Sequence, residues 1–305
     1  MKLVIKESRF EGFLYKYAEF RKEKRSSNGD LIFIGGAFQD IKASYKICRE
    51  LSNYFNVYSL DLPGSGAADI LPCTYDFSYL ANVVNHFAEL VNVNKFHIVG
   101  CSYGSPVAYR IAQLFPQKIG RIVFTGAMKS IPPENVDVLK KTIELAESGR
   151  IYEFDNLLTR MFFNYEKSNV IPKQHYIMKK FSNILKEMNL SMKLKYAENT
   201  KRLLKESLNL TPRIFSSTLI VTGEYDNFTT PAYCKKFSSM CENSITTFIK
   251  NSDHFFHAEQ HKITIKLISQ FLIGGDIRHI EGHSKYSSAN NNQYAQVIAS
   301  EFETS

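Results

Sequence analysis

The stretch Phe96-His-Ile-Val-Gly-Cys-Ser-Tyr-Gly104 decides the fold of this chain. Its apolar half is typical of a buried strand, and it stops abruptly at Ser102, which has a glycine two positions before it and another two positions after it. Glycines at these positions let neighbouring backbone pass close to a tight turn. The pattern therefore predicts a strand, a sharp turn with Ser102 at its apex, and the start of a helix. A serine at such an apex is a candidate nucleophile.

Strands and helices are predicted to alternate on both sides of this turn. Apolar runs typical of buried strands occur at residues 31–34, 57–60, 121–125 and 218–222, and a further strand is predicted at residues 244–249. Helical spacing of apolar residues separates them, at residues 45–54, 79–91, 105–114 and 263–272. This alternation predicts an α/β fold with a mostly parallel central sheet and helices on both faces. The pattern in residues 1–20 adds an antiparallel hairpin at one sheet edge.

The alternation stops between residues 131 and 216, where helical periodicity appears without a convincing buried strand. We therefore expect a core made of residues 1–130 and 217–273, with residues 131–216 inserted as a helical cap over the sheet. From Gly274 onward the composition shifts to Gly, Ser, Asn and charged residues. That shift predicts a polar, mobile C-terminal tail over residues 274–305.

Length and composition limit the function classes. The chain has 305 residues, of which 44% are hydrophobic, so it can bury a large core. No apolar run is long enough for a membrane span, and the N-terminus lacks a signal-peptide core, so we expect no membrane span and a cytoplasmic protein. The formal net charge is +8, but Lys and Arg are dispersed and no nucleic-acid-binding motif is present. We therefore expect no nucleic acid as partner.

The cysteines and histidines give no metal signature. Five cysteines form no C-x-x-C pair, which indicates neither a disulfide framework nor a zinc site. Six of the eight histidines show no spacing typical of metal ligands: His86, His97, His175, His261, His279 and His283. We therefore expect no metal and no cofactor.

A serine hydroxyl is a weak nucleophile at neutral pH, so it needs a base within hydrogen-bond reach and a group that orients the base. Asp226 follows the strand predicted at 218–222, and His254 follows the strand predicted at 244–249. Both side chains therefore fall at the carboxyl end of the sheet, beside Ser102. Asp253 is an alternative orienting acid and His257 a rival base. Adjacent residues point apart in an extended chain, which favours Asp226 over Asp253.

The order serine, acid, histidine resembles the α/β-hydrolase superfamily over roughly residues 31–272, apart from the insertion. The resemblance implies Ser102 as nucleophile, His254 as base and Asp226 as orienting acid. It also implies an oxyanion hole made of the Tyr103 backbone N–H and one N–H from the loop after the third strand. That loop usually reads His-Gly in the family, and here it reads Gly35-Gly36-Ala37-Phe38. Ala37 is therefore the candidate second donor.

The sharp turn with Ser102 at its apex implies acyl transfer through an acyl-serine. The first hypothesis is therefore a serine hydrolase that cleaves a small-molecule ester or thioester. Apolar residues near the insertion suit an apolar acyl chain, although residues at helical spacing are more often core. A different hypothesis, from outside the enzymes, is a homologue that binds a ligand or partner without catalysis. The candidate substrate-binding residues are Phe38, Met161, Phe162 and Phe181.

A second resemblance is to the hydroxyalkanoyloxy-alkanoate synthase acyltransferase of rhamnolipid assembly. It rests on Phe55-Asn-Val57 leading to Asp61-Leu-Pro63, on Asp226-x-x-Thr229-Thr230, and on His254-Phe255. It implies the second hypothesis, hydroxyacyl transfer from a thioester carrier by the same triad. An acidic acyl carrier protein would then dock on lysines of the insertion, which otherwise form a solvated helix surface. These are Lys140, Lys141, Lys179, Lys180, Lys186, Lys193 and Lys195.

Overall fold

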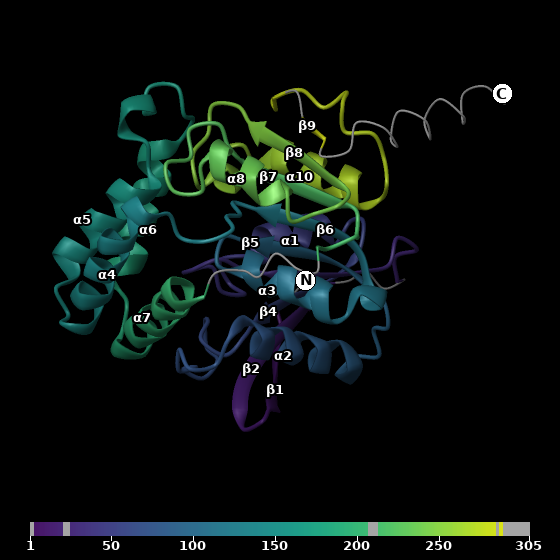
Figure 1. Cartoon of the computed structure of the whole chain (residues 1–305), viewed down its shortest axis with the longest axis horizontal. Coiled ribbons are helices and arrows are strands. Elements are labelled where there is room, and N and C mark those ends of the chain that lie inside the picture. The colour runs from purple at the N-terminus through teal and green to yellow at the C-terminus, as the bar shows by residue number, and fades with distance from the viewer. Residues whose placement is uncertain (1–2, 21–24, 207–212, 285–286, 289–305) are drawn as a thin grey trace.

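The computed structural model describes residues 3–20, 25–206, 213–284 and 287–288, and one sheet lies at its centre (Figure 1). The strand order is β1-β2-β4-β3-β5-β6-β7-β8-β9. Neighbours from β4 to β8 pair in parallel, whereas β1, β2 and β9 pair antiparallel at the two edges. The mostly parallel sheet is thereby confirmed. The strands are β1 (Ile5–Phe10), β2 (Phe13–Phe20), β3 (Asp30–Ile34), β4 (Asn56–Asp61), β5 (Phe96–Cys101), β6 (Ile119–Thr125), β7 (Thr218–Gly223), β8 (Ser244–Ile249) and β9 (Ser287–Ser288).

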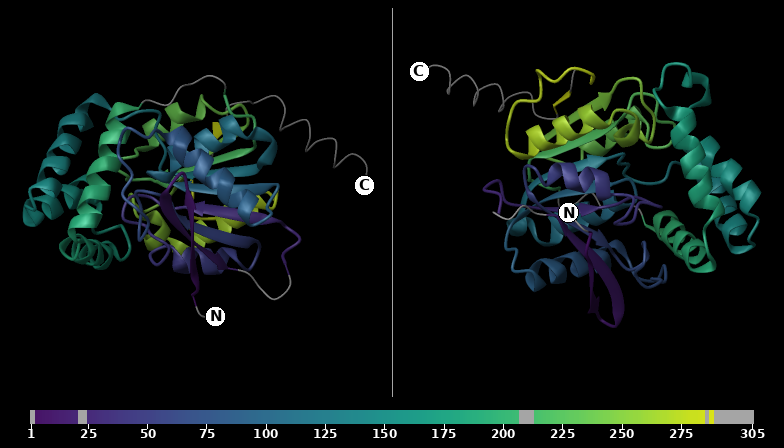
Figure 2. Two further views of the ribbon diagram at one scale, coloured as in Figure 1. Left: turned by 90° about the horizontal axis from the view of Figure 1, so that it is seen from below. Right: turned by 180° about the vertical axis from the view of Figure 1, so that it is seen from behind.

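Helices cover both faces of the sheet, as the views in Figures 1 and 2 show. The helices α1 (Tyr45–Leu51) and α10 (His261–Leu272) share one buried cluster with the strands. The opposite cluster contains residues of α2 (Phe77–Leu90), α3 (Gly104–Leu114) and α8 (Pro231–Ser238). Short helices complete this part of the chain: η1 (Pro116–Lys118) and α9 (Phe256–Glu259).

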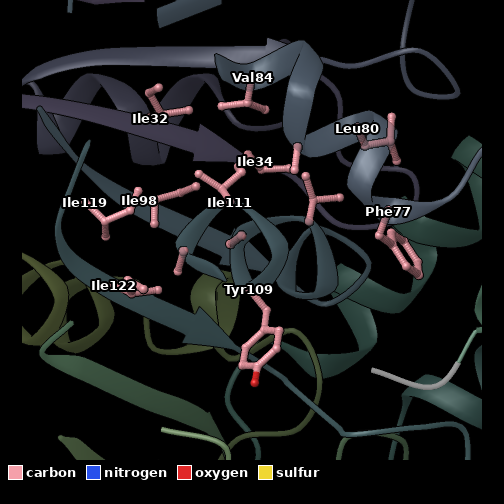
Figure 3. Close-up of a cluster of buried hydrophobic side chains, with 14 of the residues drawn as sticks. Ile32, Ile34, Phe77, Leu80, Val84, Ile98, Tyr109, Ile111, Ile119 and Ile122 are labelled. Atoms are coloured by element: carbon pink, nitrogen blue, oxygen red, sulfur yellow. The ribbon is translucent and has the colours of Figure 1, made fainter. Parts of the chain in front are cut away.

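Strand residues alternate between these two clusters, because successive side chains of a strand point to opposite faces. In β3, Ile32 and Ile34 pack toward α2 and α3, whereas Leu31 and Phe33 pack toward α1 and α10. Figure 3 shows Ile32 and Ile34 beside side chains from the neighbouring strands and helices. A continuous apolar run in the sequence is therefore a strand that is buried on both faces.

The segment between β6 and β7 is helical where the structure describes it, and it gathers on one side of the sheet (Figures 1 and 2). It has its own apolar cluster, which reaches the sheet through Phe38, Phe228 and Phe255, in the loops after β3, β7 and β8. Its division from the core as a cap domain stays a prediction. Its helices are α4 (Pro133–Glu147), α5 (Ile151–Phe162), η2 (Tyr165–Lys167), α6 (Gln174–Lys186) and α7 (Leu190–Lys205).

The polar tail does not begin at Gly274, which corrects the sequence prediction. Ile277 and Ile280 are buried in the cluster that contains α10. His283 Nδ1 lies 2.8 Å from the hydroxyl oxygen of Thr247 in β8. Two isoleucines supply apolar surface that the average composition of this stretch conceals. Residues 285–286 and 289–305 of the predicted tail lie outside the described residues, and residues 287–288 form β9. In the part of the chain that is described, no helix is both long and apolar enough to cross a membrane.

Candidate active site

Ser102 lies on a strained turn between β5 and α3. Its φ angle is 46°, in the left-handed region that non-glycine residues rarely adopt. Small neighbours are required here, because a Cβ on Gly104 would lie 2.6 Å from the carbonyl oxygen of Ile34. The Ser102 N–H donates to the carbonyl oxygen of Thr125 over 2.7 Å, which fixes the turn to the end of β6. The turn predicted from the sequence is present, and it holds Ser102 at the carboxyl end of the sheet.

Asp226 and His254 meet at the ends of β7 and β8. His254 Nδ1 lies 2.9 Å from Asp226 Oδ2. The same oxygen accepts the hydroxyls of Thr222 and Thr229 at 2.7 and 2.6 Å. The other oxygen accepts the backbone N–H groups of Phe228 and Thr229, each at 2.8 Å. Both oxygens of the Asp226 carboxylate therefore have hydrogen-bond partners, and the carboxylate contacts the His254 ring at Nδ1 rather than at Nε2. This is the arrangement that an orienting acid requires.

The two pKa values shift in opposite directions. Burial by itself would raise the pKa of Asp226, but attraction to His254 and the hydrogen bonds from His254, Thr229 and Thr222 bring that pKa below its usual value. Burial alone would lower the pKa of His254, yet the charge of Asp226 and the hydrogen bond to it raise that pKa above 6.5 overall. The site thus stabilises an imidazolium beside a carboxylate, which is the state that a base reaches after taking a proton.

We expect kcat/KM to fall on the acid side with an apparent pKa above 6.5. A base must be neutral to accept a proton, so activity is present above the pKa of His254 and is lost as the pH falls through it. The measurement is kcat/KM for a neutral p-nitrophenyl ester between pH 5 and 9. His257→Gln is the control, because burial lowers the pKa of His257 to about 4 and this side chain stays neutral throughout. An acid limb centred well below 6.5 would contradict the assignment of His254 as base.

Asp253 points away from the histidine beside it in sequence. Its Oδ2 accepts Gln174 Nε2 at 2.8 Å and the backbone N–H of Asn164 at 3.3 Å, both from the helical insertion. Its Oδ1 accepts the backbone N–H of Phe255 at 3.1 Å. Asp253 therefore attaches the insertion to the loop after β8. The geometry favours Asp226 over this alternative for orienting His254.

The loop after β3 approaches Ser102 as an oxyanion-hole loop would. A Cβ on Gly36 would lie 3.2 Å from Ser102 Cβ, so this backbone passes close to Ser102. The Gly36 N–H donates to Gln39 Oε1 at 3.1 Å, which orients the loop. Within the described part of the chain, the N–H groups of Ala37 and Tyr103 donate to no acceptor. Both remain the candidate oxyanion donors.

Of the four predicted substrate-binding residues, Phe162 touches the Asp–His pair. Its ring stacks on that of His254, with centroids 4.9 Å apart and planes 16° apart. Phe38 instead stacks on Tyr196 at 5.1 Å and meets Phe181 edge-on at 5.6 Å. Met161 packs against the same cluster. Phe181 thus belongs to the apolar cluster of the insertion, and Phe38 and Met161 pack against that cluster.

A cavity opens beside Ser102, and none of those four residues lines it. Its wall comes from α2, from the loop after β6, from α7 and from the loop after β7. No pattern along the chain marks these positions, because they lie in separate elements that only the fold brings together. The lining includes Phe77, Met128, Ile131, Leu203, Glu206 and Phe228.

A buried arginine on α7 was also missed. Arg202 has no exposed surface, and all of its N–H groups are bonded to neutral acceptors. One of them reaches the hydroxyl of Tyr103, the residue after Ser102, at 2.6 Å. Burial raises the pKa of that hydroxyl to about 12, so it stays protonated, and it donates to Asn199 Oδ1 at 2.9 Å. The other acceptors of Arg202 are Asn199 Oδ1 and the carbonyl oxygens of Leu71, Pro72 and Tyr75.

The strand order, the strained serine after β5 and the Asp–His pair after β7 and β8 together define an α/β hydrolase. Residues 31–260, most of the chain, match the family model of the alpha/beta hydrolase fold, so the chain belongs to this family. In the described residues, no three His, Cys, Asp or Glu side chains gather as metal ligands would.

Related proteins and structures agree with the family. A putative esterase/lipase of Haemophilus influenzae is 22% identical over 274 residues, which cover 83% of this chain and 87% of that protein. An uncharacterized hydrolase of Saccharomyces cerevisiae is 24% identical over 166 residues; the match spans 51% of this chain and only about half, 54%, of that protein.

Two solved structures show the same fold. The α/β hydrolase MGS-M2 from a deep-sea metagenome library superposes with a TM-score of 0.79 at 18% identity, over 89% of this chain and 98% of that one. The enol-lactonase of Burkholderia xenovorans LB400 superposes with a TM-score of 0.74 at 15% identity, over 88% and 99%. At these identities the likeness concerns the fold.

Proposed function

We propose that this chain hydrolyses an ester or thioester through an acyl-serine, with Ser102 as nucleophile, His254 as base and Asp226 as orienting acid. The observation that carries the proposal is the 2.9 Å contact between His254 Nδ1 and Asp226 Oδ2, which leaves Nε2 free to serve a serine held on a strained turn. The names of relatives, which include an esterase/lipase and hydrolases, agree with this reaction class.

The reaction runs in two halves. Ser102 Oγ attacks the carbonyl carbon while His254 Nε2 takes its proton, and the N–H groups of Ala37 and Tyr103 stabilise the oxyanion. The bond to the leaving alcohol or thiol then breaks, and the imidazolium gives that group the proton. In the second half a water attacks the acyl-serine, with His254 again as base, and releases the free acid and Ser102. The apolar wall of the cavity beside Ser102 favours an apolar substrate.

Transfer to a hydroxyl instead of water would use the same intermediate. Most of the lysines that would receive an acidic acyl carrier protein are exposed, but one of them is not open to a partner. Lys195 is buried, and its Nζ donates to the carbonyl oxygen of Gly66 at 2.9 Å. Lys141 is paired with Glu144 at 2.8 Å. The names of relatives favour hydrolysis, and acyl transfer becomes one outcome of the test.

A fluorophosphonate probe tests the proposal. We expect the wild-type protein to be labelled and Ser102→Ala to lose all labelling, because the phosphonylated atom is Ser102 Oγ. Ser130→Ala is the matched control, since Ser130 also lines the cavity but is exposed and takes no part in the triad. An unlabelled wild type, or labelling that persists in Ser102→Ala, would overturn the proposal and favour a protein that only binds ligands.

Product analysis separates hydrolysis from transfer. Wild-type protein receives an acyl thioester with and without a hydroxyacyl acceptor, and mass spectrometry identifies the products. Free acid under both conditions is the expected result. An ester product that forms only with the acceptor would replace hydrolysis with acyl transfer.

A further inference from the structure

We propose that the cavity beside Ser102 binds an apolar part of the substrate that ends in a hydrogen-bond donor, a hydroxyl or an ammonium group, and that Glu206 is the residue that recognises this donor. This inference rests on the proposed function and adds a substrate class to it. It is argued from the lining of the cavity and from the position of the Glu206 carboxyl group.

The cavity is an apolar space with one acidic residue in its wall. Phe77 and Phe228 are buried, and their rings form two sides of it, with Met128, Ile131 and Leu203 completing the apolar lining. Ser102 also lines the space, so a group bound there is next to the reacting bond. A pocket of this kind takes orientation and specificity from its few polar groups.

Glu206 lies between the ends of two helices. It follows the last residue of α7, where the helix dipole opposes a carboxylate, but its carboxyl group accepts the N–H of Phe77, the first residue of α2, where the dipole favours one. It is also half-buried, and burial raises its pKa, with a smaller opposing effect from the hydrogen bond of Phe77 N–H. A half-buried acid in the wall of a candidate active site, with a pKa that burial raises, is typical of a functional residue.

The carboxyl group has acceptor capacity left for a ligand. Its one hydrogen bond among the described residues comes from the backbone N–H of Phe77, at 3.4 Å, which is long for an N–H···O bond. A carboxyl group offers about four lone-pair sites, so most of them are available. A substrate hydroxyl or ammonium satisfies such an acceptor, whereas a substrate carboxylate meets a second acid and leaves both groups poorly solvated.

Charged neighbours do not replace this role. Lys129 lines the same cavity but is exposed, where water screens its charge. Arg202, one turn before Glu206 on α7, directs its N–H groups to the hydroxyl of Tyr103, to Asn199 and to backbone carbonyls. The charges of Arg202 and Arg110 lower the pKa of Glu206 and that of Asp76 raises it, but all three effects are smaller than the effect of burial.

Two matched substrate series test the proposal, one for each side of the ester bond. The first is the p-nitrophenyl esters of octanoic, 8-hydroxyoctanoic, 8-aminooctanoic and suberic acids. The second is the acetate esters of alcohols that carry the same four terminal groups. In one of the two series we expect wild-type kcat/KM to be highest for the hydroxyl or ammonium terminus and lowest for the carboxylate. Comparing kcat/KM for the hydroxyl-terminated and the amino-terminated substrate decides which donor is preferred.

The variant Glu206→Gln should lose this discrimination. We expect the preference for the donor over the methyl terminus to shrink about tenfold, and the penalty on the carboxylate to shrink similarly, because a neutral amide replaces the acid. Lys129→Gln is the control and should leave both ratios within about twofold. Fluorophosphonate labelling is measured in parallel: it should persist in Glu206→Gln, which separates this inference from the proposed function. Unchanged ratios in both series, with labelling intact, would overturn the role of Glu206.

Discussion

Replacing Asp226 by Asn should lower kcat by about 10⁴-fold while the fold stays intact, the size of effect known for this change in a serine triad. An amide in place of the carboxylate no longer stabilises the imidazolium, and it favours the wrong tautomer of His254. The change is nearly isosteric, and the donors from Thr222, Thr229 and the backbone surround the same volume. Single-turnover and steady-state kinetics with a p-nitrophenyl ester measure the loss, and circular dichroism verifies the fold.

Asp253→Asn is the matched control for this result. Asp253 is just as buried as Asp226 and precedes His254 directly, but its oxygens serve Gln174, Asn164 and Phe255. We expect kcat within about tenfold of wild type. If Asp253→Asn were the more damaging variant and Asp226→Asn retained near-normal turnover, the orienting role would pass to Asp253.

Replacing Arg202 by Met should reduce the free energy of unfolding by about 3 kcal/mol, because each buried acceptor left unsatisfied is destabilising by roughly 1–3 kcal/mol. The side chain bridges the loop after β4, Tyr103 and α7 itself. Methionine fills much of the volume but donates no hydrogen bond. Chemical denaturation, followed by the midpoint and slope of the transition, measures the change.

Lys205→Met controls for the loss of a positive charge on the same helix, because Lys205 is exposed in the last turn of α7. We expect a change below about 0.5 kcal/mol for this variant. Tyr103→Phe removes one acceptor of Arg202 and keeps the backbone N–H beside Ser102. Its loss of unfolding free energy should therefore lie between those of Arg202→Met and Lys205→Met. Equal stability of Arg202→Met and Lys205→Met would show that the buried network contributes nothing to folding.

The Asp226–His254 pair and Arg202 differ in how far the sequence alone reveals them. Asp226 and His254 could be found because each follows a predicted strand, and the carboxyl ends of parallel strands share one edge of a sheet. The helix α7 was not singled out, because the face that docks on the core is polar. Lys195, Asn199 and Arg202 lie on this face, and apolar periodicity cannot reveal such a contact.

The substrate cavity shows the same limit. Apolar residues of the insertion were the reasonable candidates, and Phe162 does lie against His254. The others pack with one another, since apolar side chains at helical spacing bury against neighbouring helices first. The lining beside Ser102 is assembled from short pieces of α2, α7 and two loops, with no common pattern along the chain.

The sequence by itself determined the α/β architecture, the turn at Ser102 and the order of the candidate triad. These features depend on local patterns: strand and helix periodicity, glycines around one turn, and polar residues directly after buried strands. Only the tertiary structure decided that Asp226 rather than Asp253 faces His254, that Arg202 fixes α7 to the turn at Ser102, and that Glu206 lines the cavity. These depend on the direction of side chains across elements far apart in the chain, which packing sets and local pattern does not.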